Sequence, residues 1–146
     1  MTTRTDALKT LLTRLVDSRD GYTDALDHVD APHLKSTLSS FLERRQRNAD
    51  EIRAVLSRMG VEVGDDGSLL ASAHRSFVGI KDILTDGDEA AVLAEIVRGE
   101  KVLLDAYDEA ITAIDGDAPE FAFLVEQHAS LSSAIGELEM RKDLAA

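Results

Sequence analysis

The sequence predicts an all-α protein: a four-helix bundle of two antiparallel hairpins joined by a long crossover that contains a short fifth helix. Three observations support this fold class. Aromatic residues make up only 4% of the chain and it has only two prolines, so strand formers and helix breakers are both scarce. Apolar residues recur at spacings of three, four and seven. The 146 residues suffice for a sizeable core, and we expect one domain over residues 1–146.

The first hairpin is predicted from two segments, about 5–29 and about 32–59. Apolar residues of the first segment share one helical face: Leu8, Leu11, Leu15, Tyr22, Leu26 and Val29. The second segment has a similar stripe: Leu38, Phe41, Leu42, Ala49, Ile52, Leu56 and Met59. Pro32 suits the first turn of a helix, and Gly60 suits a left-handed helix end. The short break between the segments makes the two helices antiparallel neighbours.

Residues 61–87 form the predicted crossover. The part from 61 to 67 contains two glycines and two aspartates, so we expect a loop there. An apolar stripe over about 69–84 then predicts the short fifth helix. Sixteen helical residues span about 24 Å, which is enough to run along most of the bundle. One long crossover between two hairpins is the connectivity of ferritin-like bundles.

The second hairpin is predicted from segments of about 89–114 and about 118–140. The stripe of the first comprises Val92, Leu93, Ile96, Leu103, Tyr107, Ile111 and Ile114. The stripe of the second comprises Phe121, Leu124, Leu131, Ile135 and Leu138. Gly116 ends the first helix. Asp117, with Glu120 three residues later and Pro119 between them, has the pattern of a capping box that begins the last helix.

Near the midpoint of each of these four helices, polar residues interrupt the apolar stripe, where an ordinary bundle has leucine, isoleucine or valine. These residues are Arg19, Arg45 with Asn48, Glu100, and Gln127 or His128. Midpoints share one height in a bundle of hairpins, so we predict a single buried polar layer. Arg19 and Arg45 are expected to face Glu100, because buried charges are costly unless they are paired.

Two arginines against one carboxylate leave an excess positive charge in this layer. Either one arginine extends outwards to solvent, or a further anion joins the layer. Tyr22 and Tyr107 lie one step away, and we expect their hydroxyls to satisfy its polar groups. His74 lies beside the stripe of the crossover helix, where docking against the bundle is the expected role.

Several short motifs occur in a defined order along the chain. They are Asp20-Gly21-Tyr22, Arg44-Arg45-Gln46-Arg47, Ala49 with Glu51, Gly60, Gly67-Ser68, His74-Arg75, and Gly99-Glu100 with Tyr107. In their order and spacing the chain resembles a bacterial ferritin-like four-helix-bundle family of uncharacterised function, within the ferritin/rubrerythrin-like superfamily. The resemblance covers almost the whole chain, and what it implies is the fold.

The chain departs from the di-iron proteins of that superfamily. Those proteins need a Glu on each of two helices and a Glu-x-x-His motif on each of the other two. No Glu-x-x-His occurs here, and the second helix offers Arg45 and Asn48 at the corresponding level. Arginine stays cationic and does not ligate metals. We therefore expect no intact di-iron site, no metal and no other cofactor.

The charge balance narrows the classes of partner. The formal net charge is −12, which disfavours nucleic acids and anionic membranes. No stretch approaches the length of a membrane span, and residues 1–9 lack the apolar core of a signal peptide, so we expect a cytoplasmic protein. The absence of cysteine excludes disulfides and thiolate chemistry.

The leading functional hypothesis is a non-catalytic bundle that acts through its structure or through protein contacts. The alternative is an ion- or small-anion-binding bundle with a vestigial site near Glu100. The third is a metal-dependent oxidoreductase, against which the count of ligands argues. We also expect a homodimer. Four valines lie off the main stripes and indicate additional apolar surface for the crossover helix or for a second subunit: Val16, Val55, Val102 and Val125.

Overall fold

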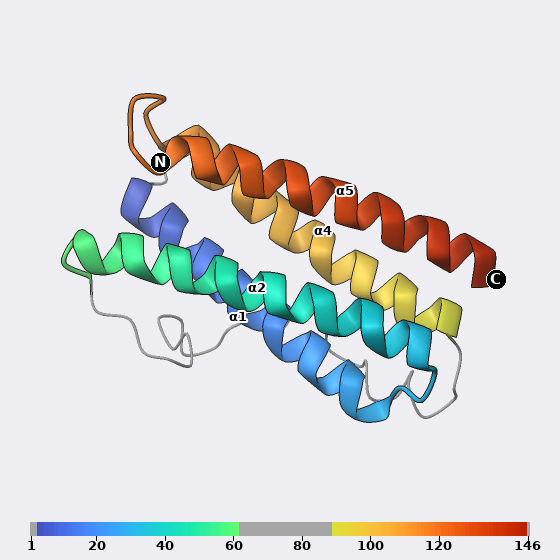
Figure 1. Ribbon diagram of the computed structural model, residues 1–146. Helices are drawn as coiled ribbons and strands as arrows, with labels where there is room; N and C mark the ends of the chain where they lie inside the picture. The colour runs from blue at the N-terminus through green and yellow to red at the C-terminus, as the bar shows by residue number, and fades with distance from the viewer. Residues whose placement is uncertain (1–2, 62–88, 146) are drawn as a thin grey trace.

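The computed structural model describes residues 3–61 and 89–145, and over these residues the fold is all-α, with four helices and no strand (Figure 1). The helices are α1 (Arg4–His28), α2 (Pro32–Arg58), α4 (Glu89–Ala113) and α5 (Phe121–Ala145). The predicted crossover helix over about 69–84, with His74, lies outside the described residues. None of the described helices combines the length and the apolar character that crossing a membrane requires.

The ends of α1 and α2 follow from local chemistry. The Thr3 hydroxyl accepts a hydrogen bond from the Asp6 backbone N–H at 3.1 Å, so it caps the start of α1. Pro32 occupies the first turn of α2, where no backbone donor is needed. The α2 helix ends before Gly60, whose φ of 79° is readily adopted by glycine and strained for other residues.

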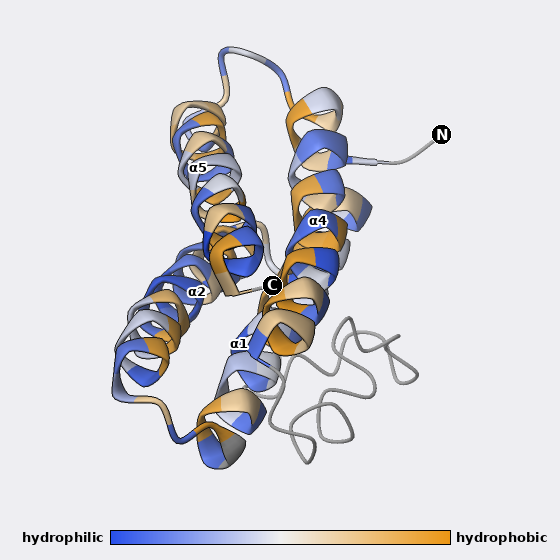
Figure 2. Cartoon of the chain, turned by 90° about the vertical axis from the view of Figure 1, so that its right-hand side faces the viewer, coloured by the Kyte–Doolittle hydropathy of each residue, from blue (hydrophilic) through white to orange (hydrophobic). Residues whose placement is uncertain are grey.

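The helices pack in three pairs: α1 against α2, α4 against α5, and α1 against α4. Each helix carries both hydrophilic and hydrophobic residues along its length, as amphipathic helices do (Figure 2). The apolar stripes form one buried cluster, in which Leu15, Leu38, Leu93 and Leu131 are fully buried representatives of the four helices. The midpoints of the helices therefore lie inside this core, where polar side chains must find partners within the protein.

The start of α5 differs from the expected one. The helix begins at Phe121, and two turns precede it: Ala118 N–H bonds to the carbonyl of Asp115 at 3.0 Å, and Phe121 N–H bonds to the carbonyl of Ala118 at 3.1 Å. Pro119 occupies the second position of the latter turn, which proline favours. Glu120 is buried and pairs with Arg4 of α1. The expected capping box is therefore wrong, because the carboxylate of Glu120 has a cationic partner on another helix.

Candidate functional site

Glu100, at the middle of α4, is the centre of a buried polar cluster. It is 0% exposed, and side chains from two other helices surround its carboxylate. The Ser18 hydroxyl donates to Oε1 at 2.6 Å, and the Tyr22 hydroxyl donates to Oε2 at 2.9 Å. Arg45 donates from Nε to Oε2 at 2.8 Å, and its Nη2 lies 2.7 Å from the same oxygen. Three donor atoms thus lie around Oε2 of the carboxylate, and one lies at Oε1.

Helical spacing explains how these residues meet. Ser18 and Tyr22 are four residues apart on α1, so their side chains project from one face. Arg45 extends from α2 towards α4, and both of these helices pack on α1. The ring of Phe41, one turn before Arg45, lies against the ring of Tyr22 with centroids 6.1 Å apart. Apolar packing therefore encloses the ion pair and keeps water from competing with its hydrogen bonds.

A second set of contacts leads from the core to the surface. The Tyr107 hydroxyl of α4 donates to Gln127 Oε1 of α5 at 2.7 Å, and Gln127 Nε2 donates to Glu51 Oε2 of α2 at 2.6 Å. Tyr107 is fully buried, Gln127 is nearly so, and Glu51 is exposed. Asn48 also hydrogen-bonds Tyr107. These contacts tie α2, α4 and α5 together at one height of the bundle.

Burial and neighbouring charges raise the pKa values of three side chains: Arg45, Tyr22 and Tyr107. Burial opposes the charge of Arg45, but the negative charge and hydrogen bonds of Glu100 outweigh it and raise the pKa of the guanidinium. Burial, followed by the charge of Glu100, raises the pKa of Tyr22 well above its usual value, although Arg45 opposes this. Burial likewise raises the pKa of Tyr107, again against the charge of Arg45. Both tyrosines are therefore neutral donors, Tyr22 to Glu100 and Tyr107 to Gln127.

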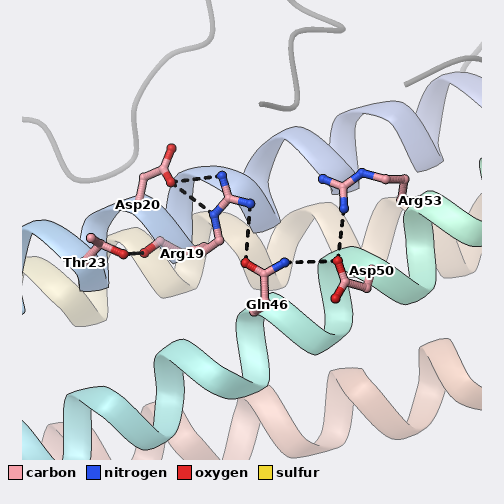
Figure 3. A network of polar contacts seen from close by, with 6 residues as sticks. All are labelled: Arg19, Asp20, Thr23, Gln46, Asp50 and Arg53. Carbon is pink, nitrogen blue, oxygen red and sulfur yellow. Dashed lines mark hydrogen bonds and ion pairs between the residues drawn. The ribbon is translucent and has the colours of Figure 1, made fainter. Parts of the chain in front are cut away.

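Arg19 does not face Glu100, contrary to expectation. Its side chain is 19% exposed and pairs with Asp20, whose Oδ1 lies 3.1 Å from both Nε and Nη2. Its Nη1 is 3.5 Å from Gln46 Oε1 on α2, in a surface network that includes Asp50 and Arg53 (Figure 3). One residue is about 100° of helical rotation, so Ser18 takes the buried position. The expected excess of positive charge is thereby removed.

The remaining predicted residues divide between the cluster and the surface. Of the two candidates on α5, Gln127 is buried and bonds Tyr107, whereas His128 is partly exposed and contacts Asp108 Oδ1 at 2.7 Å. Asn48 is half-buried beside Tyr107. Ser18 and Glu51 were missed as partners of the layer. The i, i+4 spacing of Ser18 and Tyr22 could have indicated that Ser18 lies in the layer. Nothing in the apolar pattern could have indicated Glu51.

The donors around Glu100 are hydroxyls and a guanidinium, and none of them is a typical ligand of iron or zinc. In the part of the chain that the structure describes, no three histidine, aspartate or glutamate side chains gather where they could hold a metal ion. The chemistry that this arrangement performs is charge neutralisation and hydrogen bonding between helices.

Over residues 3–61 and 89–145 the chain is an all-α protein of four helices, with a buried arginine–glutamate pair at its centre. A family described as a domain of unknown function (DUF2383) matches residues 3–113, which is more than half of the chain, and the protein belongs to this family. All four side chains of the Glu100 cluster fall within the matched residues, whereas α5 lies beyond them. No curated protein and no solved structure matches the chain.

Proposed function

We propose that the protein is a non-catalytic, ferritin-like bundle of the cytoplasm, in which the Arg45–Glu100 pair occupies the level where di-iron proteins of that fold hold their metals. The proposed connectivity is two antiparallel hairpins joined by the crossover over residues 61–87. The short connections between α1 and α2 and between α4 and α5, together with the packing of both pairs, support it. The family's description as a domain of unknown function is compatible with this role.

The enclosure of the Glu100 carboxylate by Ser18, Tyr22 and Arg45 is the observation that carries the proposal. A metal ion at this carboxylate would have to displace donors that already surround it, namely Ser18, Tyr22 and Arg45. The displaced guanidinium would remain buried without a counter-ion, which typically costs about 3–5 kcal/mol. The cluster is therefore suited to fixing the positions of three helices rather than to binding iron.

The alternative of a small-anion site at Glu100 has less support. It depended on a second arginine in the layer to provide an unpaired positive charge. Because Arg19 pairs with Asp20 at the surface, Arg45 and Glu100 neutralise each other one for one. An anion beside Glu100 would meet a negative carboxylate with no spare cation.

Elemental analysis tests whether the bundle holds iron, as a metal-dependent enzyme of this fold would. The protein would be produced in iron-supplemented medium and purified without added metal or chelator. We expect far less than one iron per chain, because Glu100 is engaged and Arg45 is cationic. About two irons per chain, placed in the bundle core by anomalous scattering, would contradict the proposal.

We further propose that the protein forms a homodimer through an outer face. Of the four valines that lie off the stripes, Val16 and Val55 are buried in the core, while Val125 is 43% exposed and Val102 is half-buried. Val102 and Val125 thus supply the apolar surface that supports an interface. Light scattering should give twice the mass of one chain, and a monomer at high concentration would contradict the dimer.

A further inference from the structure

A polar cleft separates α2 from α5, next to the contact between Glu51 and Gln127. Its volume is about 340 Å³, within the size range of small-molecule sites. The α2 side presents Arg44, Arg47 and Glu51 at spacings of three and four residues, so they share one face. The α5 side presents Glu126 and Gln127. The proposed scaffold role uses the Glu51–Gln127 contact and leaves Arg44, Arg47 and Glu126 without a function.

Most arginines of the described residues pair with an acid, whereas the two arginines of the cleft, like Arg58, do not. Acidic residues outnumber Lys and Arg by 28 to 16, and arginines such as Arg53 and Arg98 pair with an acid on their own helix. Within residues 3–61 and 89–145, neither Arg44 nor Arg47 forms an ion pair with an acid. The Arg44 guanidinium lies 5.2 Å from the centroid of the Phe41 ring, a cation–π contact that positions it.

The acids of the cleft are also available for a ligand. Glu126 is exposed and forms no ion pair with the described residues. Glu51 is held in place by Gln127 Nε2 at its Oε2, and its charge has no cationic partner within the described residues. The cleft thus combines two cations on α2 with one acid on each wall. A ligand with a single sign of charge would be attracted by one pair and repelled by the other.

We propose that this cleft binds a small zwitterion: a free molecule with a phosphate or carboxylate group for Arg44 and Arg47, and an ammonium group for Glu51 and Glu126. The planar guanidinium suits an oxyanion because it can donate two parallel hydrogen bonds. Glu51 and Gln127 link the cleft to Tyr107, and the chain has no tryptophan. Tyrosine fluorescence can therefore report binding.

Calorimetric titration at constant ionic strength tests the proposal on the whole chain. The probes are O-phosphoethanolamine and γ-aminobutyrate, with phosphate and ethanolamine as single-charge fragments. We expect at least one zwitterion to bind about tenfold or more tightly than either fragment, and to change tyrosine fluorescence. Absence of binding by both zwitterions, or equal affinity for phosphate and O-phosphoethanolamine, would overturn it. Co-sedimentation with phosphatidylethanolamine vesicles without binding of a free zwitterion would assign a lipid headgroup and also overturn it.

Substitutions at exposed positions test which residues bind the zwitterion, and they are not expected to unfold the protein. Arg47 borders both the α2–α5 cleft and a second groove between α1 and α2. Arg44 borders the α2–α5 cleft and does not line the second groove. Arg44→Gln should therefore lower the affinity for the zwitterion about tenfold. Glu126→Gln should lower the affinity for the zwitterion but not the affinity for phosphate. Arg58→Gln, at an exposed position near the end of α2, is the matched control and should leave affinity unchanged. Equal effects of Arg44→Gln and Arg58→Gln would overturn the assignment.

Discussion

Two polar clusters join α1 to its neighbours, and they differ chiefly in depth. The buried cluster consists of Ser18, Tyr22, Arg45 and Glu100. The surface network consists of Arg19, Asp20, Gln46, Asp50 and Arg53 (Figure 3). Each contains arginine paired with a carboxylate at about 3 Å, so the contact distances alone would rank them as equals.

Exposure to solvent determines how much each cluster contributes to the free energy of unfolding. A member of the surface network that loses its partner is rehydrated, so exposed ion pairs contribute about 0–1 kcal/mol. A member of the buried cluster has no such substitute, and its removal leaves an uncompensated charge in the core. The distances therefore identify the partners of each side chain, whereas burial sets the cost of losing a partner. Four measurements test this conclusion.

The largest effect is expected for Glu100→Gln. The substitution preserves shape, removes the negative charge and leaves Arg45 buried without a counter-ion. We expect a loss of about 3–5 kcal/mol in the free energy of unfolding, measured by denaturant melts. The same change at exposed Glu126 should cost under about 0.5 kcal/mol. Similar losses in the two variants would mean that Glu100 is not the centre of the cluster.

High pH should destabilise the protein through its two tyrosines. Their pKa values are raised in the folded state, so folding is favoured fully below the unfolded pKa of about 10 and progressively less above it. The free energy of unfolding should fall by up to about 1.4 kcal/mol per pH unit for each tyrosine. Tyrosinate absorbance should appear together with the loss of helical circular dichroism. Ionisation of either residue near pH 10 in the folded protein would contradict this.

Ser18→Ala should have an intermediate effect. Ser18 is nearly inaccessible to solvent, and its hydroxyl is the donor to Glu100 Oε1. Hydrogen bonds to charged groups contribute about 1.5–3 kcal/mol, and we expect a loss in that range in chemical denaturation. Ser132→Ala, at an exposed position of α5, is the control and should change stability by less than about 0.5 kcal/mol. If Ser18→Ala leaves the free energy of unfolding unchanged, the hydrogen bond of Ser18 does not stabilise the cluster.

The smallest effect is expected for Arg19→Ala. Arg19 pairs with Asp20 near the surface, so its loss should cost no more than about 1 kcal/mol. The cost should shrink further in 1 M salt, because salt screens exposed charges. Thermal melts at low and high salt would measure both quantities. A loss comparable with that of Glu100→Gln would place Arg19 in the buried cluster after all.

The sequence predicted well where a residue's place on the apolar stripe determined its environment. Arg45 and Glu100 interrupt long stripes of leucine and isoleucine, and both are buried; of the two alternatives on α5, Gln127 is buried and His128 is partly exposed. Helical periodicity therefore located polar residues in the core without any knowledge of their partners.

The apolar periodicity did not identify Ser18, rather than Arg19, as the residue of α1 that contacts Glu100. Both lie near the stripe of α1, but a long arginine can reach solvent from a half-buried position, whereas serine is small enough to stay inside. Hydropathy alone does not distinguish these outcomes. The start of α5 failed for a different reason, since the partner of Glu120 is Arg4, more than a hundred residues away in the sequence. Such tertiary contacts are invisible to local capping rules.

The position of Arg45 on α2 and Glu100 on α4 also bears on which surfaces can associate. The α1–α2 half of the bundle contributes Arg45 to the central ion pair, and the α4–α5 half contributes Glu100. Two α1–α2 halves packed on each other would enclose two arginines, and two α4–α5 halves would enclose two glutamates. Both mismatched assemblies would bury like charges. The ion pair thus discriminates against incorrect association in a protein whose apolar stripes alone would be compatible with several pairings.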